Sequence, residues 1–245
     1  MSLGQTKIMC VVNLSPDSFH APSIASSLDD FKRKVDGFLD AGADIIDLGA
    51  CSSRPGSVIV DMEEEWRRLE PYLECVARDY AGYSFSIDTF RSSIVLMAYQ
   101  TIGRFIINDI SAGEWDPAML PVAGRLGLRY VAVHHCGTFD TIHDCHRYDD
   151  VVKEVAEYFC NFKVLAEEAG ISEWILDPGF GFSKSTEDNI KLLEGLQEFK
   201  KFRRPILVGL SDKRMTQGNT DEFEKKAINL GASILRTHRM PCFEL

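Results

Sequence analysis

The chain has 245 residues, of which 45% are hydrophobic and 26% are charged, and its formal net charge is −10. This acidic balance argues against nucleic acid as a partner, because neutralising phosphates requires a basic surface. No apolar run approaches the roughly 20 residues that a membrane helix requires, so we expect no membrane span.

Cysteine usage points to a reducing compartment. The chain has seven cysteines, an odd number without paired spacing, which suits the cytoplasm better than a disulfide framework. Residues 1–4 lack the regions of a signal peptide and are expected to be leader or cloning residue. Because no polar linker or low-complexity stretch divides the sequence, we expect a single domain over residues 1–245.

Short apolar runs alternate with helical stretches along the chain. The runs are rich in Ile and Val and too short for buried helices, so they predict eight buried strands. In chain order they are residues 8–14, 45–50, 84–89, 105–110, 130–135, 174–179, 205–210 and 233–238. Between the first two, residues 27–42 have a helical pattern, with Ser27 as the expected N-cap and Gly42 as the stop. Eight such units favour a parallel (β/α)8 barrel of the TIM type over a doubly wound open sheet.

Polar side chains stand at the carboxyl ends of the predicted strands, where this architecture places its active sites. They could instead be caps of the following helices, since Asp, Asn and Ser are common capping residues. Carboxylates, carboxamides and basic groups together make a mixed-charge pocket that capping alone does not require. The set is Asn13, Asp47, Asp88, Asn108, Asp109, His134, His135, Asp177, Ser211, Arg236 and His238.

Seven motifs lie in order at these strand ends and extend over nearly the whole chain. They are VVNLSPDSF, GADIIDLGACSSRPG, SIDT, INDI, LDPGFGFSK, VGLSDK and LRTH. Together they resemble the motifs of dihydropteroate synthase. The resemblance implies a cytoplasmic transferase of folate biosynthesis. Such an enzyme joins 6-hydroxymethyl-7,8-dihydropterin pyrophosphate to para-aminobenzoate, with Mg²⁺ present, and releases 7,8-dihydropteroate and pyrophosphate.

The resemblance also assigns roles to residues. It implies that Lys213, Arg236 and His238 are catalytic and that Asn13 reaches the metal. The residues that match the pterin-binding positions are Asp88, Asn108, Asp177 and Lys213. Those that match the para-aminobenzoate and pyrophosphate positions are Asp17, Phe19, Ser53, Arg54, Phe182, Ser211, Arg236 and His238.

The stretch LDPGFGFSK places a carboxylate directly before a Pro-Gly break and two aromatic rings after it. A carboxylate can accept two hydrogen bonds at once from the flat donor edge of a pterin, which suits Asp177. Phe180 and Phe182 either face flat substrates or belong to the core, and Phe182 is the better candidate for the benzoate side.

Several positions depart from the family pattern. Asp212 stands where arginine is usual, and Arg239 where aspartate is usual. Cys51 and Val133 replace a usual glutamate and methionine. The crossover from Lys213 to Arg236 is shortened, and we expect no complete eighth helix.

These departures keep two further hypotheses open beside an active synthase. One is a pterin-holding homologue without synthase activity. The other is a pterin-dependent methyltransferase domain, against which the SPDSF and SSRPG loops speak. Without an eighth helix the flank beside the last and first strands should expose apolar surface, so we expect a homodimer.

Two other patterns suggest different chemistry. The stretch GFGFSKS resembles a phosphate-binding P-loop, but it has Ser183 where that motif needs glycine before its lysine. Residues 134–146 gather four histidines with Cys136 and Cys145, which raises a zinc hypothesis, although the spacing matches no regular zinc finger.

Overall fold

The computed structural model describes residues 6–15, 24–52, 59–144, 146–211 and 213–243. Strands and helices alternate along this part of the chain. The strands are β1 (Lys7–Asn13), β2 (Ile45–Gly49), β3 (Phe85–Asp88), β4 (Ile106–Asp109), β5 (Arg129–Val133), β6 (Trp174–Asp177), β7 (Leu207–Val208) and β8 (Ile234–Thr237). The α-helices are α1 (Leu28–Asp40), α2 (Met62–Asp79), α3 (Ser92–Ile102), α4 (Met119–Leu126), α5 (Val151–Glu168), α6 (Thr186–Glu194) and α7 (Thr220–Leu230). Two 3-10 helices, η2 (Leu196–Phe202) and η3 (Arg214–Thr216), flank β7.

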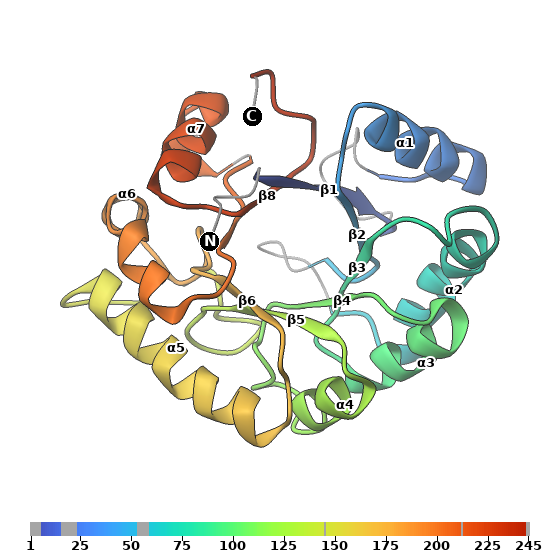
Figure 1. Ribbon diagram of the computed structural model, residues 1–245, viewed down its shortest axis with the longest axis horizontal. Coiled ribbons are helices and arrows are strands. Elements are labelled where there is room, and N and C mark those ends of the chain that lie inside the picture. Colours follow the sequence, from blue (N-terminus) through green and yellow to red (C-terminus); the bar gives the residue numbers. More distant parts are fainter. Residues whose placement is uncertain (1–5, 16–23, 53–58, 145, 212, 244–245) are drawn as a thin grey trace.

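The eight strands form one parallel sheet in the order β6-β5-β4-β3-β2-β1-β8-β7. Its two ends meet, because Leu176 on β6 forms an isolated parallel bridge with Ile206. At this seam the amide of Leu176 donates to the carbonyl of Pro205 at 2.9 Å. The helices surround the strands as an outer ring (Figure 1). The predicted parallel barrel is therefore confirmed.

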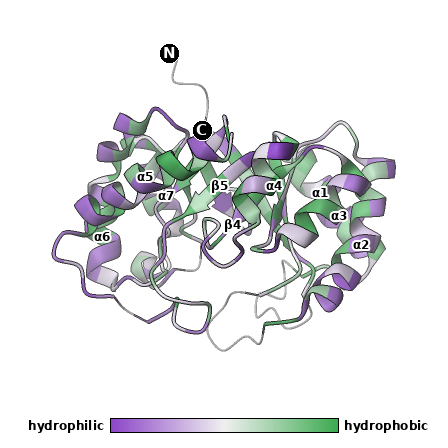
Figure 2. Ribbon diagram, turned by 90° about the horizontal axis from the view of Figure 1, so that it is seen from below, coloured by the Kyte–Doolittle hydropathy of each residue, from purple (hydrophilic) through white to green (hydrophobic). Residues whose placement is uncertain are grey.

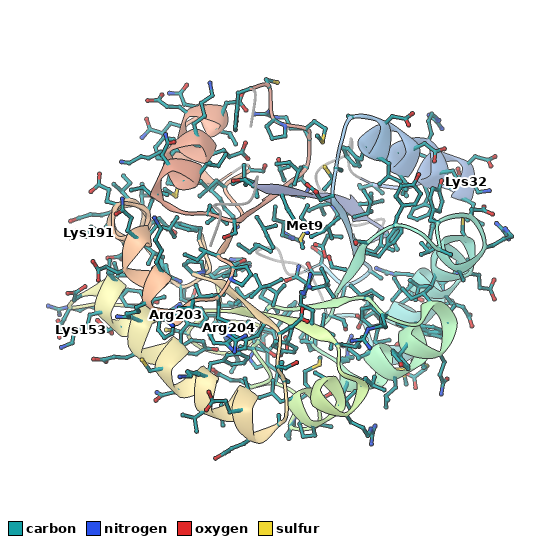
Figure 3. The ribbon with its side chains drawn as sticks, in the orientation of Figure 1. Met9, Lys32, Lys153, Lys191, Arg203 and Arg204 are labelled. Atoms are coloured by element: carbon teal, nitrogen blue, oxygen red, sulfur yellow. The ribbon has the colours of Figure 1, made fainter. Side chains whose placement is uncertain are left out.

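Two apolar cores hold the barrel together. The inner one fills the barrel and comes from seven of the strands, with Met9 in the middle (Figure 3); its members are Met9, Ile45, Ile106, Val131, Val133, Ile175, Leu207 and Ile234. The larger one packs between the sheet and the helices. The helices accordingly mix hydrophobic and hydrophilic residues (Figure 2), as amphipathic helices on a sheet must.

Helix α1 shows how local sequence sets an element. The hydroxyl of Ser27 accepts from the amide of Asp30 at 3.2 Å, as an N-cap does. Phe31 and Val35, one turn apart, are both fully buried. The helix ends at Asp40, and Gly42 takes a φ of +93° on the way to β2. Both predicted ends of this helix are confirmed.

The inner face of the barrel changes from apolar to polar within two residues. Side chains two apart on a strand face the same side, so an inner-core residue is followed by a polar one nearer the carboxyl end. The pairs are Ile45 and Asp47, Ile106 and Asn108, Ile175 and Asp177, and Ile234 and Arg236. This layering places a polar layer directly above the inner core, at the mouth of the barrel.

The part of the chain described after β8, residues 238–243, contains no helix. It lies between α7 and α1 in the outer ring (Figure 1). Met240 and Phe243 pack against the outer core there. Among the described residues, no helix combines the length and the apolar character needed to cross a membrane.

Candidate active site at the carboxyl ends of the strands

The pairing register of the strands aligns several predicted site residues. Asn13 on β1 is paired with Gly49, Gly49 with Asp88 on β3, and Asp88 with Asn108 on β4. A single row across four strands thus brings Asn13, Asp88 and Asn108 to the same level of the barrel mouth.

Asp47 on β2 is the centre of this polar layer; the sequence analysis counted it among the strand-end polar residues but assigned it no role. Its side chain is fully buried and accepts hydrogen bonds from the hydroxyl of Ser86 and from the side-chain Nδ2 of Asn108, the latter at 3.2 Å. Its position at a strand end, in IIDLGA, was the available signal. Strand-end position alone did not distinguish it from a helix cap.

Arg236 on β8 joins Asp47 to Asp88. Its Nε donates to Asp47 at 2.7 Å and its Nη2 to Asp88 at 2.8 Å. Burial raises the pKa of Asp88 to about 7, although Arg236 acts to lower it. Burial alone would lower the pKa of Arg236, but the two carboxylates raise it above its usual value. The charge of Arg236 is therefore already shared between two acids before any substrate binds.

Asp177 lies at the end of β6, where the Pro-Gly break turns the chain. Its Oδ1 accepts from the amide of Gly179 at 2.8 Å, and its backbone carbonyl accepts at 2.9 Å from the backbone amide of His134, the first residue after the neighbouring strand β5. The residue is only 8% exposed. Burial raises the pKa of Asp177 to about 6, against the lowering effect of the Gly179 hydrogen bond.

The two aromatic rings after Asp177 have different surroundings. Phe180 is 2% exposed and belongs to the outer core, between sheet and helices. Phe182 is half-buried and packs against the inner core, and the ammonium group of Lys213 lies 4.7 Å from its ring centroid. Phe182 therefore lies with Lys213 at the barrel mouth, while Phe180 has a packing role.

The loop after β7 and the end of β8 are tied together. The hydroxyl of Ser211 is 2.7 Å from that of Thr237, which lies between Arg236 and His238 in the sequence. His238 is half-buried. Arg239, next in the chain, makes an ion pair of 2.6 Å with Asp221 on α7. The predicted residues Ser211, Lys213 and His238 thus come from two adjoining strand ends.

Five other residues of interest lie outside the described part of the chain. Four are predicted to bind para-aminobenzoate and pyrophosphate, and the fifth is the departure beside Lys213. They are Asp17, Phe19, Ser53, Arg54 and Asp212.

Sequence reasoning also missed Lys184, the last residue of LDPGFGFSK. Its side chain is buried beside His134, with 2.8 Å between the Lys184 Nζ and the His134 Nδ1. A lysine just after the aromatic turn was the only local sign, and a lone lysine is usually a solvated surface charge.

The histidines of the stretch 134–146 make separate contacts with different aromatic side chains. His135 packs edge-on against Trp115 at 5.2 Å, and His146 against Tyr148 at 4.8 Å. Cys145 lies outside the described residues. Over the rest of the chain that the structure describes, no three His, Cys, Asp or Glu side chains gather closely enough to hold a metal ion.

Together the described residues make a polar layer that combines buried carboxylates with cations. Asp177 and Asn108 offer acceptors and donors suited to a flat heterocycle, and the Phe182 ring offers an apolar face. Lys213 and His238 supply donors suited to an anion. The arrangement can bind a flat donor-rich ring deep in the mouth and an anionic group above it.

Comparison with known proteins agrees with this geometry. The family model for pterin binding enzymes matches residues 9–238. The dihydropteroate synthase of Escherichia coli is 37% identical over 217 residues, covering 88% of this chain and 76% of that protein.

Solved structures give the same result. A Yersinia pestis dihydropteroate synthase in a sulfonamide drug complex superposes with a TM-score of 0.88 at 30% identity, covering 98% of this chain and 90% of that one. A Xanthomonas albilineans dihydropteroate synthase with 4-aminobenzoic acid gives 0.85 at 33% identity, covering 97% and 89%. With a family match over most of its length and this polar layer at its barrel mouth, the chain belongs to the pterin-binding enzymes and, among them, to the dihydropteroate synthases.

Proposed function

We propose that this chain condenses 6-hydroxymethyl-7,8-dihydropterin pyrophosphate with para-aminobenzoate, giving 7,8-dihydropteroate and pyrophosphate. The observation that carries the proposal is the single polar layer formed by Asp88, Asn108, Asp177 and Arg236 above the inner core. That layer suits a flat heterocycle, and its position matches the active-site end of the barrel.

The pterin ring would be recognised by buried acceptors. The carboxylate of Asp177 can take two hydrogen bonds from the guanidine-like edge of the ring, and it is ionised above its pKa of about 6. The side-chain Nδ2 of Asn108 already donates to Asp47, which fixes the orientation of the Asn108 side chain. The residues that bind the ring are thus oriented in advance.

The chemical step needs a stabilised leaving group more than a base. The carbon–oxygen bond to pyrophosphate breaks, and the electron pair leaves with pyrophosphate. The amine nitrogen of para-aminobenzoate then bonds to the methylene carbon and gives up a proton. Donors placed where the departing anion gathers charge lower this barrier, and Lys213 and His238 are the donors proposed for this role.

Arg236 alone cannot neutralise the departing anion, because Asp47 and Asp88 already share its charge. This favours a role for Mg²⁺, which would be held by the carboxamide oxygen of Asn13 and by substrate oxygens. Mg²⁺ usually keeps several waters and borrows ligands from phosphate, so one amide fits it although no three-ligand cluster occurs in the described residues. When bound, the ion would supply positive charge to the pyrophosphate.

The alternative is a pterin-holding homologue without synthase activity. It is favoured by Asp212, the neighbour of Lys213 in the sequence, and by the shortened crossover from Lys213 to Arg236. We favour the active synthase, because Lys213, Arg236 and His238 would have little reason to stand together around a neutral ring. A methyltransferase would likewise not need these cations.

The deciding experiment incubates the purified protein with dihydropterin pyrophosphate, para-aminobenzoate and Mg²⁺ and looks for dihydropteroate by mass spectrometry. Product that is lost in Lys213→Ala supports the synthase. Tight pterin binding without product, with activity gained in Asp212→Arg, would establish the homologue without synthase activity.

We also propose a cytoplasmic homodimer. The six cysteines in the described part of the chain are all free thiols, which fits a reducing compartment. Among the described residues, the short segment 238–243 lies between α7 and α1, where the outer ring has no helix. Light scattering at micromolar concentration tests the dimer, and a monomeric mass would reject it.

A further inference from the structure

Lys184 is buried with all its hydrogen-bonding capacity used. The residue is 6% exposed, and its Nζ lies 2.8 Å from the His134 Nδ1 and 3.0 Å from the carbonyl oxygens of both Gly179 and Phe182. An ammonium group has three donors and no acceptor, so three acceptors match the charged form. Buried lysines are rare unless they are paired in this way.

The ring of His134 is in the right state to accept. Burial, and then the charge of Lys184, hold the pKa of His134 well below its usual value, so the imidazole is neutral near pH 7. Burial lowers the pKa of Lys184 to about 7, while Cys136 and Asp177 act to raise it. Near pH 6.5 a charged lysine therefore faces a neutral histidine whose Nδ1 carries no proton.

One of the two carbonyls belongs to Gly179, the residue that holds the carboxylate of Asp177 proposed to bind the pterin. The amide of Gly179 donates to Asp177, and its carbonyl accepts from Lys184. Gly179 has a φ of +71°, and a Cβ there would be 1.9 Å from the carbonyl oxygen of His134. The backbone at Gly179 is therefore packed directly against the end of β5.

The other carbonyl belongs to Phe182, whose ring contacts Lys213, the proposed catalytic lysine. Phe182 accepts from Lys184 through its backbone, and its ring lies under the ammonium of Lys213. Between them, a Cβ at Gly181 would be 2.9 Å from the Lys213 Cδ. The turn 179–182 thus has Lys184 and His134 on one side and Lys213 on the other.

We propose that Lys184 is a positioning residue, whose ammonium group fixes the turn 179–182 against His134 and so sets the Asp177 carboxylate and the Phe182 ring for the two substrates. The inference rests on the proposed function for the identity of the substrates. Lys184 itself touches neither substrate in this scheme, because its three donors are already engaged by the protein.

The test is a graded series at Lys184, measured at pH 6.5. Lys184→Met keeps the length and removes every donor, whereas Lys184→Gln keeps two donors. Calorimetry with a pterin ligand should show at least a tenfold rise in Kd for Lys184→Met and a smaller rise for Lys184→Gln. In the assay, KM for both substrates should rise more than kcat falls, as expected when binding groups are displaced.

Lys191→Met is the matched control. Lys191 lies on the outer surface of α6 (Figure 3), pairs with Glu187 at 2.8 Å, and its side chain is 59% exposed. Its Kd and KM values should equal those of the wild type. A Lys184→Met protein that is folded by circular dichroism and retains wild-type Kd and KM would overturn the proposal.

A measurement on the wild type covers the case in which the variants do not fold. Nitrogen-15 NMR should show His134 with its proton on Nε2 and none on Nδ1. A proton on Nδ1 would refute the contact with Lys184. Because pterin binding is measured without turnover, a wild type that binds pterin but forms no product would reject the proposed condensation and leave this inference standing.

Discussion

Arg236 on β8 and Asp47 on β2 form an ion pair of 2.7 Å inside the barrel mouth, although they are 189 residues apart in the sequence. Both strands adjoin β1, so closure of the sheet brings the two side chains together. The pair is mostly withdrawn from water, with the Asp47 side chain fully buried and that of Arg236 26% exposed. The same aspartate orients Asn108, so one acid organises both the basic and the carboxamide side of the site.

Asp47→Asn should destabilise the protein by about 3 kcal/mol, because it leaves a buried guanidinium with a weaker partner. Urea unfolding measures the change. The control is Glu173→Gln, which breaks an ion pair of equal length with Arg129 at an exposed site, and there the loss should stay below about 1 kcal/mol. Equal losses in the two variants would show that the buried pair contributes no more to the free energy of unfolding than the exposed pair does.

Asp177→Asn should weaken pterin binding by on the order of 2 to 4 kcal/mol at pH 8, at least tenfold in Kd. The amide turns one acceptor into a donor that faces the donors of the pterin. Calorimetry with a pterin ligand measures the loss, and wild-type affinity in this variant would remove Asp177 from the site.

The ratio of the two Kd values, variant to wild type, should fall towards one as the pH drops to 5. The pKa of Asp177 is raised to about 6, so the wild type loses its carboxylate as the pH falls through that value. Asp88, whose pKa is raised to about 7, titrates in both proteins and cancels in the ratio. A ratio that stays constant from pH 8 to 5 would assign the pH dependence to another group.

The two phenylalanines of the turn should respond in opposite ways to the same substitution. Phe180→Leu should cost about 1 to 2 kcal/mol of stability, because it leaves space in the outer core, with KM unchanged. Phe182→Leu should leave stability nearly unchanged but raise KM for para-aminobenzoate roughly threefold to tenfold, since Lys213 loses the ring beneath it. Unfolding curves and initial rates on both variants separate the effect on stability from the effect on KM. If both variants changed the same quantity, the assignment of Phe180 to the core and Phe182 to the site would be wrong.

The sequence determined the architecture because the relevant signals are local. Short runs of Ile and Val, with helical patterns between them, depend only on neighbouring residues, and they predicted the alternating elements of the barrel. The ends of α1 followed from Ser27 and Gly42 in the same way. Since parallel strands expose their carboxyl ends on one rim, the strand-end residues predicted the location of the site. Local patterns were less informative at residues 205–210, where only Leu207–Val208 form a strand.

Only the tertiary structure decided how the polar groups are paired. The sequence could not show that Asp47 connects Arg236 with Asn108, because these contacts depend on barrel closure and strand register. The sequence favoured Phe182 over Phe180 for the substrate side but left a core role open for both rings; the path of the turn, with a positive φ at both Gly179 and Gly181, decided between them. Lys184 is the strongest case. Burying a lysine costs the solvation free energy of its ammonium group unless the protein replaces the lost hydrogen bonds. Here three acceptors, brought together by the end of β5 and the turn after β6, replace them.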